Sequence, residues 1–101
     1  MEIKVQSIRF EATEKLQDYI QKKVQKLTRF CADIIKADVA LKVVKPETAI
    51  NKEASLRLTV PGSELFTEKT ANTFEEAIDQ CADTMVRQLQ KYKEQLPKKD
   101  K

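Results

Sequence analysis

The chain has 101 residues and a net charge of +3, and 41% of its residues are hydrophobic. This length fits a single domain, and no apolar run is long enough to span a membrane. The chain holds no histidine and a single glycine, which removes the commonest acid-base residue and any glycine loop for phosphate. Two cysteines cannot form a zinc site without other ligands. The composition therefore argues against an enzyme, a metal site or a cofactor.

The first element in chain order is a predicted strand over residues 2–10, where apolar and polar side chains alternate. The alternation slips near Ser7, which either a bulge or the end of the strand would explain. Residues 13–31 have the pattern of an amphipathic helix, with Thr13 as its N-cap. Its expected apolar face consists of Leu16, Tyr19, Ile20, Val24, Leu27, Phe30 and Cys31.

Three further strands are predicted over residues 34–45, 53–60 and 64–71. The apolar side of the first is expected to consist of Ile35, Ala37, Val39, Leu41 and Val43. Pro46 ends the first of them, and Pro61-Gly62-Ser63 is a hairpin turn between the other two. The short links indicate that these three strands run antiparallel. The last strand is the most polar, which suits an exposed face or the edge of a sheet.

A second helix is predicted to begin after Thr73, which forms a capping box with Glu76, and to run to about Leu96, where Pro97 ends it. Its expected apolar face consists of Phe74, Ala77, Ile78, Cys81, Met85, Leu89 and Tyr92.

The predicted fold class is α+β, with the order β-α-β-β-β-α. Each helix has one apolar stripe, so we expect a four-stranded sheet with both helices packed on one face and the other face polar and open to water. Residues 1–96 should form one domain and residues 97–101 a basic disordered tail. No secretory signal is visible after the first residues, which favours a cytoplasmic protein with reduced thiols and no membrane partner.

Positive charge is concentrated in one segment of each predicted helix. Residues 22–29 contain four basic residues and no acid, and residues 87–101 contain six basic residues and two acids. Basic side chains one helical turn apart suit contacts with phosphates. A solvated helix face with cations toward the helix C-terminus is an equally good interpretation of this pattern alone.

Two polar features of the predicted helices need a separate interpretation. Lys23 falls inside the apolar arc of the first helix, so its ammonium group must reach water or a partner. Asp79 and Asp83 lie one turn apart on the second helix and are expected to be solvated carboxylates rather than catalytic ones.

The cysteines and tyrosines are expected to serve the core. Cys31 and Cys81 lack CxxC spacing and are interpreted as buried structural thiols. Tyr19 and Tyr92 should pack in the core with their hydroxyl groups at its edge. Stacking on a nucleic acid base remains an alternative for Tyr92.

Three segments have motifs of a known family. The most specific is Ala77-Ile78-Asp79 followed by Arg-Gln-Leu-Gln-Lys-Tyr-Lys over residues 87–93, and residues 39–45 and 53–62 are the other two. They resemble the family of short ribosome hibernation promoting factors, which includes ribosome-associated inhibitor A. The resemblance covers about residues 1–96. It implies a fold similar to double-stranded RNA-binding domains and binding to the small ribosomal subunit, in the channel where messenger and tRNA anticodon stems pass.

The resemblance also implies a function and a site. The function is that of a non-enzymatic translation inhibitor that stabilises idle ribosomes in stationary phase or stress, with rRNA of the decoding region as partner and no cofactor, metal or small-molecule substrate. Away from the ribosome we expect a monomer. The implied rRNA-binding residues are Lys22, Lys23, Lys26, Arg87, Gln88, Lys91 and Lys93, and the one-turn spacing of the basic residues adds Arg29 to the predicted site.

Two alternatives remain open at the level of sequence. The first is a generic module for double-stranded RNA that acts on free RNA. The second is a protein-interaction module that uses the open face of the sheet.

Overall fold

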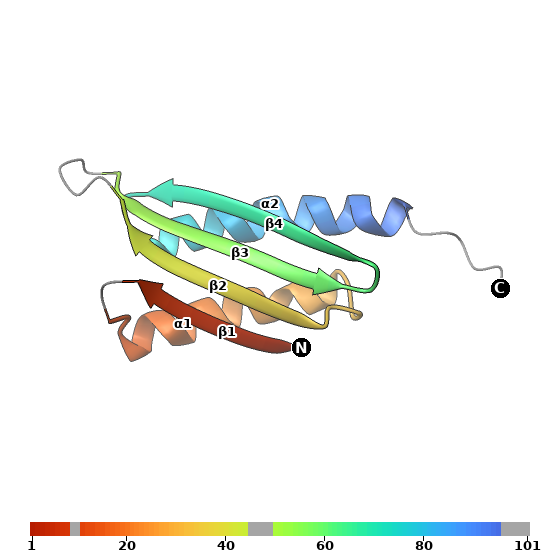
Figure 1. Ribbon diagram of the computed structural model, residues 1–101, viewed down its shortest axis with the longest axis horizontal. Helices are drawn as coiled ribbons and strands as arrows, with labels where there is room; N and C mark the ends of the chain where they lie inside the picture. Colours follow the sequence, from red (N-terminus) through yellow and green to blue (C-terminus); the bar gives the residue numbers. More distant parts are fainter. Residues whose placement is uncertain (9–10, 45–49, 96–101) are drawn as a thin grey trace.

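The computed structural model describes residues 1–8, 11–44 and 50–95 (Figure 1). Its elements confirm the predicted order β-α-β-β-β-α. They are β1 (Glu2–Ile8), α1 (Glu14–Gln25), the 3-10 helix η1 (Lys26–Arg29), β2 (Lys36–Val43), β3 (Lys52–Val60), β4 (Ser63–Ala71) and α2 (Phe74–Gln95). The predicted strand ends at residues 9–10 and 45, the helix end at Leu96 and Pro97, and the tail at 97–101 lie outside the described residues.

The strands form one sheet in the order β1-β2-β3-β4. β1 pairs with β2 in parallel, whereas β2, β3 and β4 pair antiparallel, as the short links predicted. The register of β1 against β2 is continuous from Glu2 to Ile8, so the slip near Ser7 is not a bulge within these residues. β4 lies at the edge of the sheet, which agrees with its polar sequence.

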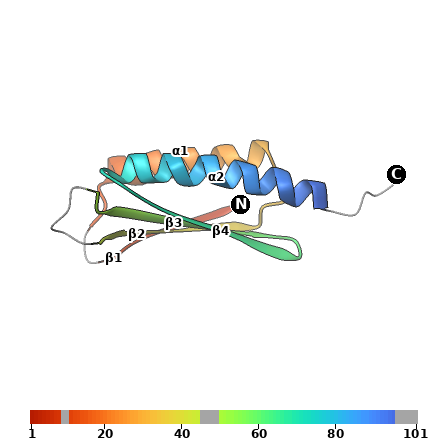
Figure 2. The same cartoon turned by 90° about the horizontal axis from the view of Figure 1, so that it is seen from above.

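Both helices cover the same face of the sheet (Figure 2). They lie side by side and run in the same direction (Figures 1 and 2). The reason is that β1 and β4 point the same way, and each helix runs antiparallel to the strand that precedes it. α1 belongs to the crossover between the parallel strands β1 and β2, and α2 packs on β3 and β4. The C-terminal halves of the two helices therefore lie at the same end of the molecule.

The core lies between this helical layer and the inner face of the sheet. The alternation of β2 and β3 places every second side chain in it: Ala37, Val39, Leu41, Ala54, Leu56, Leu58 and Val60. The helices contribute the predicted apolar stripes: Leu16, Ile20, Val24, Leu27, Phe74, Ala77, Ile78, Cys81, Met85, Leu89 and Tyr92.

The structure corrects three expectations about the apolar faces. Phe30 is 38% exposed, because the chain tightens into the 3-10 helix η1 after Gln25 and this changes the angle at which later side chains project. Ile35 and Val43, at the two ends of the β2 pattern, are also exposed, so burial is confined to the middle of that strand.

The predicted N-caps of both helices and the glycine turn are confirmed. The hydroxyl of Thr13 accepts a hydrogen bond from the backbone N–H of Leu16, and that of Thr73 accepts one from Glu76, each at 3.1 Å. Gly62 adopts a φ of 77° in the turn between β3 and β4, a conformation that favours glycine. No helix in the described part of the chain is long and apolar enough to cross a membrane.

Candidate RNA-binding surface

The outward side of α1 and η1 carries three cations that the helix brings together. Lys22 and Lys26 are one turn apart, and Arg29 follows on η1. With Gln21, Gln25 and Thr28 they line a shallow depression of about 480 Å³, so all of its lining side chains are polar or basic. None of the three cations forms an ion pair with any residue that the structure describes. We refer to Lys22, Lys26 and Arg29 as the α1 basic surface.

The predicted site residues of α2 differ in what they contact. Gln88 and Lys91 lie on the flank of α2 that faces β4, where they line a hollow of about 160 Å³ with Ser63 and Leu65. The side-chain amide of Gln88 donates a hydrogen bond to the backbone carbonyl of Phe66 at 3.0 Å, which attaches α2 to the edge strand.

Arg87 and Lys93 are exposed, and within residues 1–8, 11–44 and 50–95 neither they nor Lys91 form an ion pair. These three cations are therefore free to meet phosphates.

Lys23 has a partner inside the fold, which explains its unusual place on the helix. Its ammonium nitrogen lies 3.1 Å from Oδ1 of Asp79 on α2, and its side chain is 33% exposed. The hydroxyl of Tyr19 donates a hydrogen bond to the same carboxylate oxygen at 2.7 Å. Asp79, expected as a solvated carboxylate, thus joins the two helices.

This contact changes the acidity of Tyr19. The hydrogen bond to Asp79, followed by burial and the negative charge of the carboxylate, raises the pKa of the Tyr19 hydroxyl to about 12. The tyrosine therefore keeps its proton, and its role as a donor, well above neutral pH.

Tyr92 and the cysteines belong to the core. Tyr92 is 8% exposed and its hydroxyl donates to the carbonyl of Pro61 at 2.8 Å, so core packing is confirmed and base stacking is wrong. Cys31 and Cys81 are buried free thiols, which confirms their structural interpretation. Burial raises the pKa of the Cys81 thiol to about 11.

Among the described residues there is no group of three His, Cys, Asp or Glu side chains that could hold a metal.

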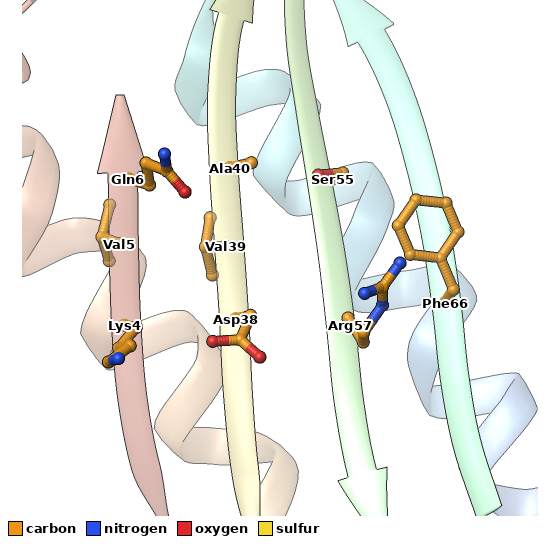
Figure 3. A pocket seen from close by; sticks show the side chains of 9 residues that line it. All are labelled: Lys4, Val5, Gln6, Asp38, Val39, Ala40, Ser55, Arg57 and Phe66. Carbon is orange, nitrogen blue, oxygen red and sulfur yellow. The ribbon is translucent and has the colours of Figure 1, made fainter. Parts of the chain in front are cut away.

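The open face of the sheet has a different character from the helical face (Figure 3). The small side chains of Ala40 and Ser55 leave a hollow of about 650 Å³ between β1 and β4. At one side of it the guanidinium of Arg57 lies 5.3 Å from the ring centroid of Phe66, which is 47% exposed.

The stacked pair of Arg57 and Phe66 was not foreseen from the sequence, although the Gly62 hairpin sets the register that places the two residues opposite each other. Lys4, Asp38 and Arg57 alternate in sign across the sheet, and this mixed charge does not suit a phosphate backbone.

The molecule is thus an α+β domain whose two parallel helices carry cations without an ion-pair partner in the described part of the chain, over a sheet with an open face of mixed charge. Residues 3–97 match the family described as Sigma 54 modulation protein / S30EA ribosomal protein, and the chain belongs to this family.

Curated relatives support this assignment. The chain is 29% identical over 94 residues to the ribosome hibernation promoting factor of Pseudomonas putida, a match that covers 93% of this chain and 88% of the relative. It is 32% identical over 94 residues to the protein of that name from Azotobacter vinelandii, with 93% and 84% covered. The resemblance to hibernation factors seen in the sequence is therefore confirmed.

The fold is also found in solved structures. The N-terminal domain of Thermus thermophilus Protein Y superposes with a TM-score of 0.80 at 25% identity, and the match covers 91% of this chain and 99% of that domain. The predicted architecture of a four-stranded sheet with two helices on one face is therefore also that of a solved structure.

Proposed function

We propose that this protein is a ribosome hibernation factor that binds rRNA in the decoding region of the small subunit and inhibits translation in stationary phase or stress. Its relatives named ribosome hibernation promoting factor support the class of function. The observation that carries the proposal is the α1 basic surface, because its three cations lie together, exposed and without an ion pair among the described residues.

The proposed mechanism is occupancy. Lysine and arginine side chains on rigid helices contact phosphates and so recognise the shape of folded RNA rather than its base sequence. The sheet supports both helices from one side, so the cations keep their spacing when the domain binds. A domain held in the channel for messenger and tRNA excludes both ligands while it stays bound, and no covalent step is required.

The proposed rRNA contacts are those predicted side chains that remain available. They are Lys22, Lys26 and Arg29 on α1 and η1, and Arg87, Lys91 and Lys93 on α2. Lys23 and Gln88, which the resemblance also implied, already bind Asp79 and the carbonyl of Phe66. We therefore assign these two to the support of the surface.

Sedimentation through a sucrose gradient tests the proposal directly. In lysate from stationary cells at low salt, the protein should sediment with small subunits or whole ribosomal particles. A variant with Lys22→Gln, Lys26→Gln and Arg29→Gln should remain at the top of the gradient. If the unmodified protein also remains at the top, the proposed function is wrong.

The hollow of the open sheet face favours a second candidate, a protein-interaction module. Phe66 presents an apolar ring there beside Arg57, and such a pair is typical of protein interfaces. The same gradient, run also with the variant Phe66→Ala, separates the two candidates. The module predicts that the natural protein itself stays at the top of the gradient, whereas the hibernation proposal predicts co-sedimentation that Phe66→Ala keeps and the α1 triple variant loses.

A further inference from the structure

One carboxylate oxygen on α2 binds two side chains of α1. Tyr19 Oη lies 2.7 Å and Lys23 Nζ lies 3.1 Å from Oδ1 of Asp79. Tyr19 and Lys23 are one helical turn apart, so both project from the flank of α1 that faces α2. Tyr19 and Asp79 are 60 positions apart in the sequence.

We propose that Asp79 is a positioning residue for RNA binding. Through Tyr19 and Lys23 it holds α1 at a fixed place beside α2, so that the α1 basic surface and the cations of α2 meet phosphates as one rigid set. This inference rests on the proposed function, and it makes Lys23 a support of the surface instead of a phosphate contact.

The contact between Lys23 and Asp79 lies next to two cations of the α1 basic surface. Lys22 precedes Lys23 and Lys26 follows it by three residues, and both line the depression of the α1 basic surface. If α1 rotated about its axis or shifted along it, Lys22 and Lys26 would both move. The shared carboxylate opposes such a movement, because it would break two contacts at once.

The charge of Asp79 also argues against a phosphate at Lys23. A phosphate within reach of the Lys23 ammonium would lie close to the carboxylate that already binds this group at 3.1 Å. Like charges at such distances repel each other, more strongly where protein shields them from water. Lys22 and Lys26 have no carboxylate within ion-pair distance in the described part of the chain, so they offer a phosphate better sites.

The test uses a variant with the same net charge as the natural chain. Lys23→Gln combined with Asp79→Asn removes one charge of each sign and leaves the net charge at +3. Its affinity for purified small subunits is measured at several salt concentrations, at a temperature well below its Tm. We expect binding about fivefold weaker, equivalent to about 1 kcal/mol, with an unchanged salt slope.

Two further variants calibrate this measurement. Lys22→Gln should reduce the salt slope by about one, since it removes a phosphate contact. Lys23→Arg, which keeps a cation opposite Asp79, should retain the affinity of the natural protein.

Two results of the binding measurements would overturn the inference. If the uncharged pair binds as tightly as the natural protein, the contact between the helices has no role in binding. If Lys23→Gln alone reduces the salt slope as Lys22→Gln does, Lys23 touches a phosphate itself.

A third measurement separates this inference from the proposed function. Lys23→Gln and Asp79→Asn should lower the Tm non-additively, because each removes the same contact. Additive losses would overturn the coupling between the two residues, whether or not the protein binds ribosomes. Failure of the natural protein to bind small subunits, with non-additive losses of Tm, would overturn the proposed function and with it the role of Asp79 in binding.

Discussion

Lys22 and Lys23 are neighbours in the chain, yet about 100° of helix rotation separates their side chains. Lys22 is exposed on the α1 basic surface, whereas Lys23 reaches Asp79 on the other helix. The same difference separates Arg87, which is exposed, from Gln88, which binds the backbone of β4. For a single residue, the direction in which its side chain projects from the helix decides whether it is available to bind RNA.

The first prediction concerns cations on both helices. Lys26→Ala together with Arg87→Ala should weaken binding to small subunits and reduce the salt slope by about two, since two proposed phosphate contacts are lost. The free energy of unfolding should change by less than about 0.5 kcal/mol, because exposed charges contribute little to stability. Binding titrations and thermal unfolding measure the two effects.

The matched control removes two cations from the open sheet face. Lys4→Ala together with Arg57→Ala carries the same change of net charge and should bind small subunits nearly as well as the natural protein. A larger loss in this control than in the helix variant would move the binding surface to the sheet.

The second prediction concerns the proton of Tyr19. Its pKa is raised to about 12 in the folded protein from an ordinary value of 10.0, so the folded state holds this proton more tightly than the unfolded state. The resulting stabilisation is complete below pH 10 and is lost as the pH rises through about 12.

A tyrosinate absorbance titration checks this directly. Subtracting the curve of Tyr19→Phe from that of the natural protein should leave one transition near pH 12. A transition near pH 10 would show that Asp79 does not bind the hydroxyl in solution.

Among the elements, local sequence signals decide where each helix begins. Thr13 and Thr73 satisfy backbone N–H groups at the first turns of α1 and α2. The end of α1 follows a different rule. The chain continues as η1 after Gln25, so the predicted single helix to residue 31 is in fact an α-helix followed by a 3-10 turn. This change of winding turns Phe30 outward.

The third prediction follows from the cap of α2. Thr73→Ala should lower the free energy of unfolding by about 1 kcal/mol, because the N–H of Glu76 loses its acceptor. Thr73→Ser keeps the hydroxyl oxygen and should remain within a few tenths of a kcal/mol of the natural protein. Chemical denaturation of the three proteins measures the difference, and equal stability of all three would show that the cap contributes nothing.

Across the whole molecule, the parallel direction of the two helices determines how charge is distributed. Acidic residues are concentrated in the first half of α2 and basic ones in the last turns of both helices. Since the helices run side by side in one direction, their basic halves lie at one end of the molecule and their more acidic halves at the other (Figures 1 and 2). A domain charged in this way is expected to approach RNA with its basic end first.

The fourth prediction belongs to this scale. If about six phosphates are contacted, affinity for the small subunit should fall by roughly a thousandfold between about 50 and 200 mM salt. A flat salt response would contradict a mechanism based on phosphates. Competition with an isolated RNA duplex completes the test, since equal affinity for duplex and subunit would favour a generic RNA-binding module.

Much of the fold was predictable because its signals are local. The alternation of β3, the threonine caps and the glycine turn each depend on residues close together in the chain, and all were confirmed. The antiparallel pairing of β2, β3 and β4 followed from their short links. The expected burial of Ile35 and Val43, at the ends of an apolar pattern, was wrong. Burial at these positions depends on whether another element covers the strand.

The sequence by itself determined the class of fold and the two basic segments, since these depend on periodicity, caps and composition, and the resemblance of its motifs indicated the family. Only the tertiary structure decided which basic side chains remain free. Asp79 lies far from Lys23 in the chain, and Phe66 lies far from Gln88, so neither contact has a local signal. A cation on a helix is available to RNA only if the element packed beside it offers no acceptor, and that depends on how the helices and the sheet pack together.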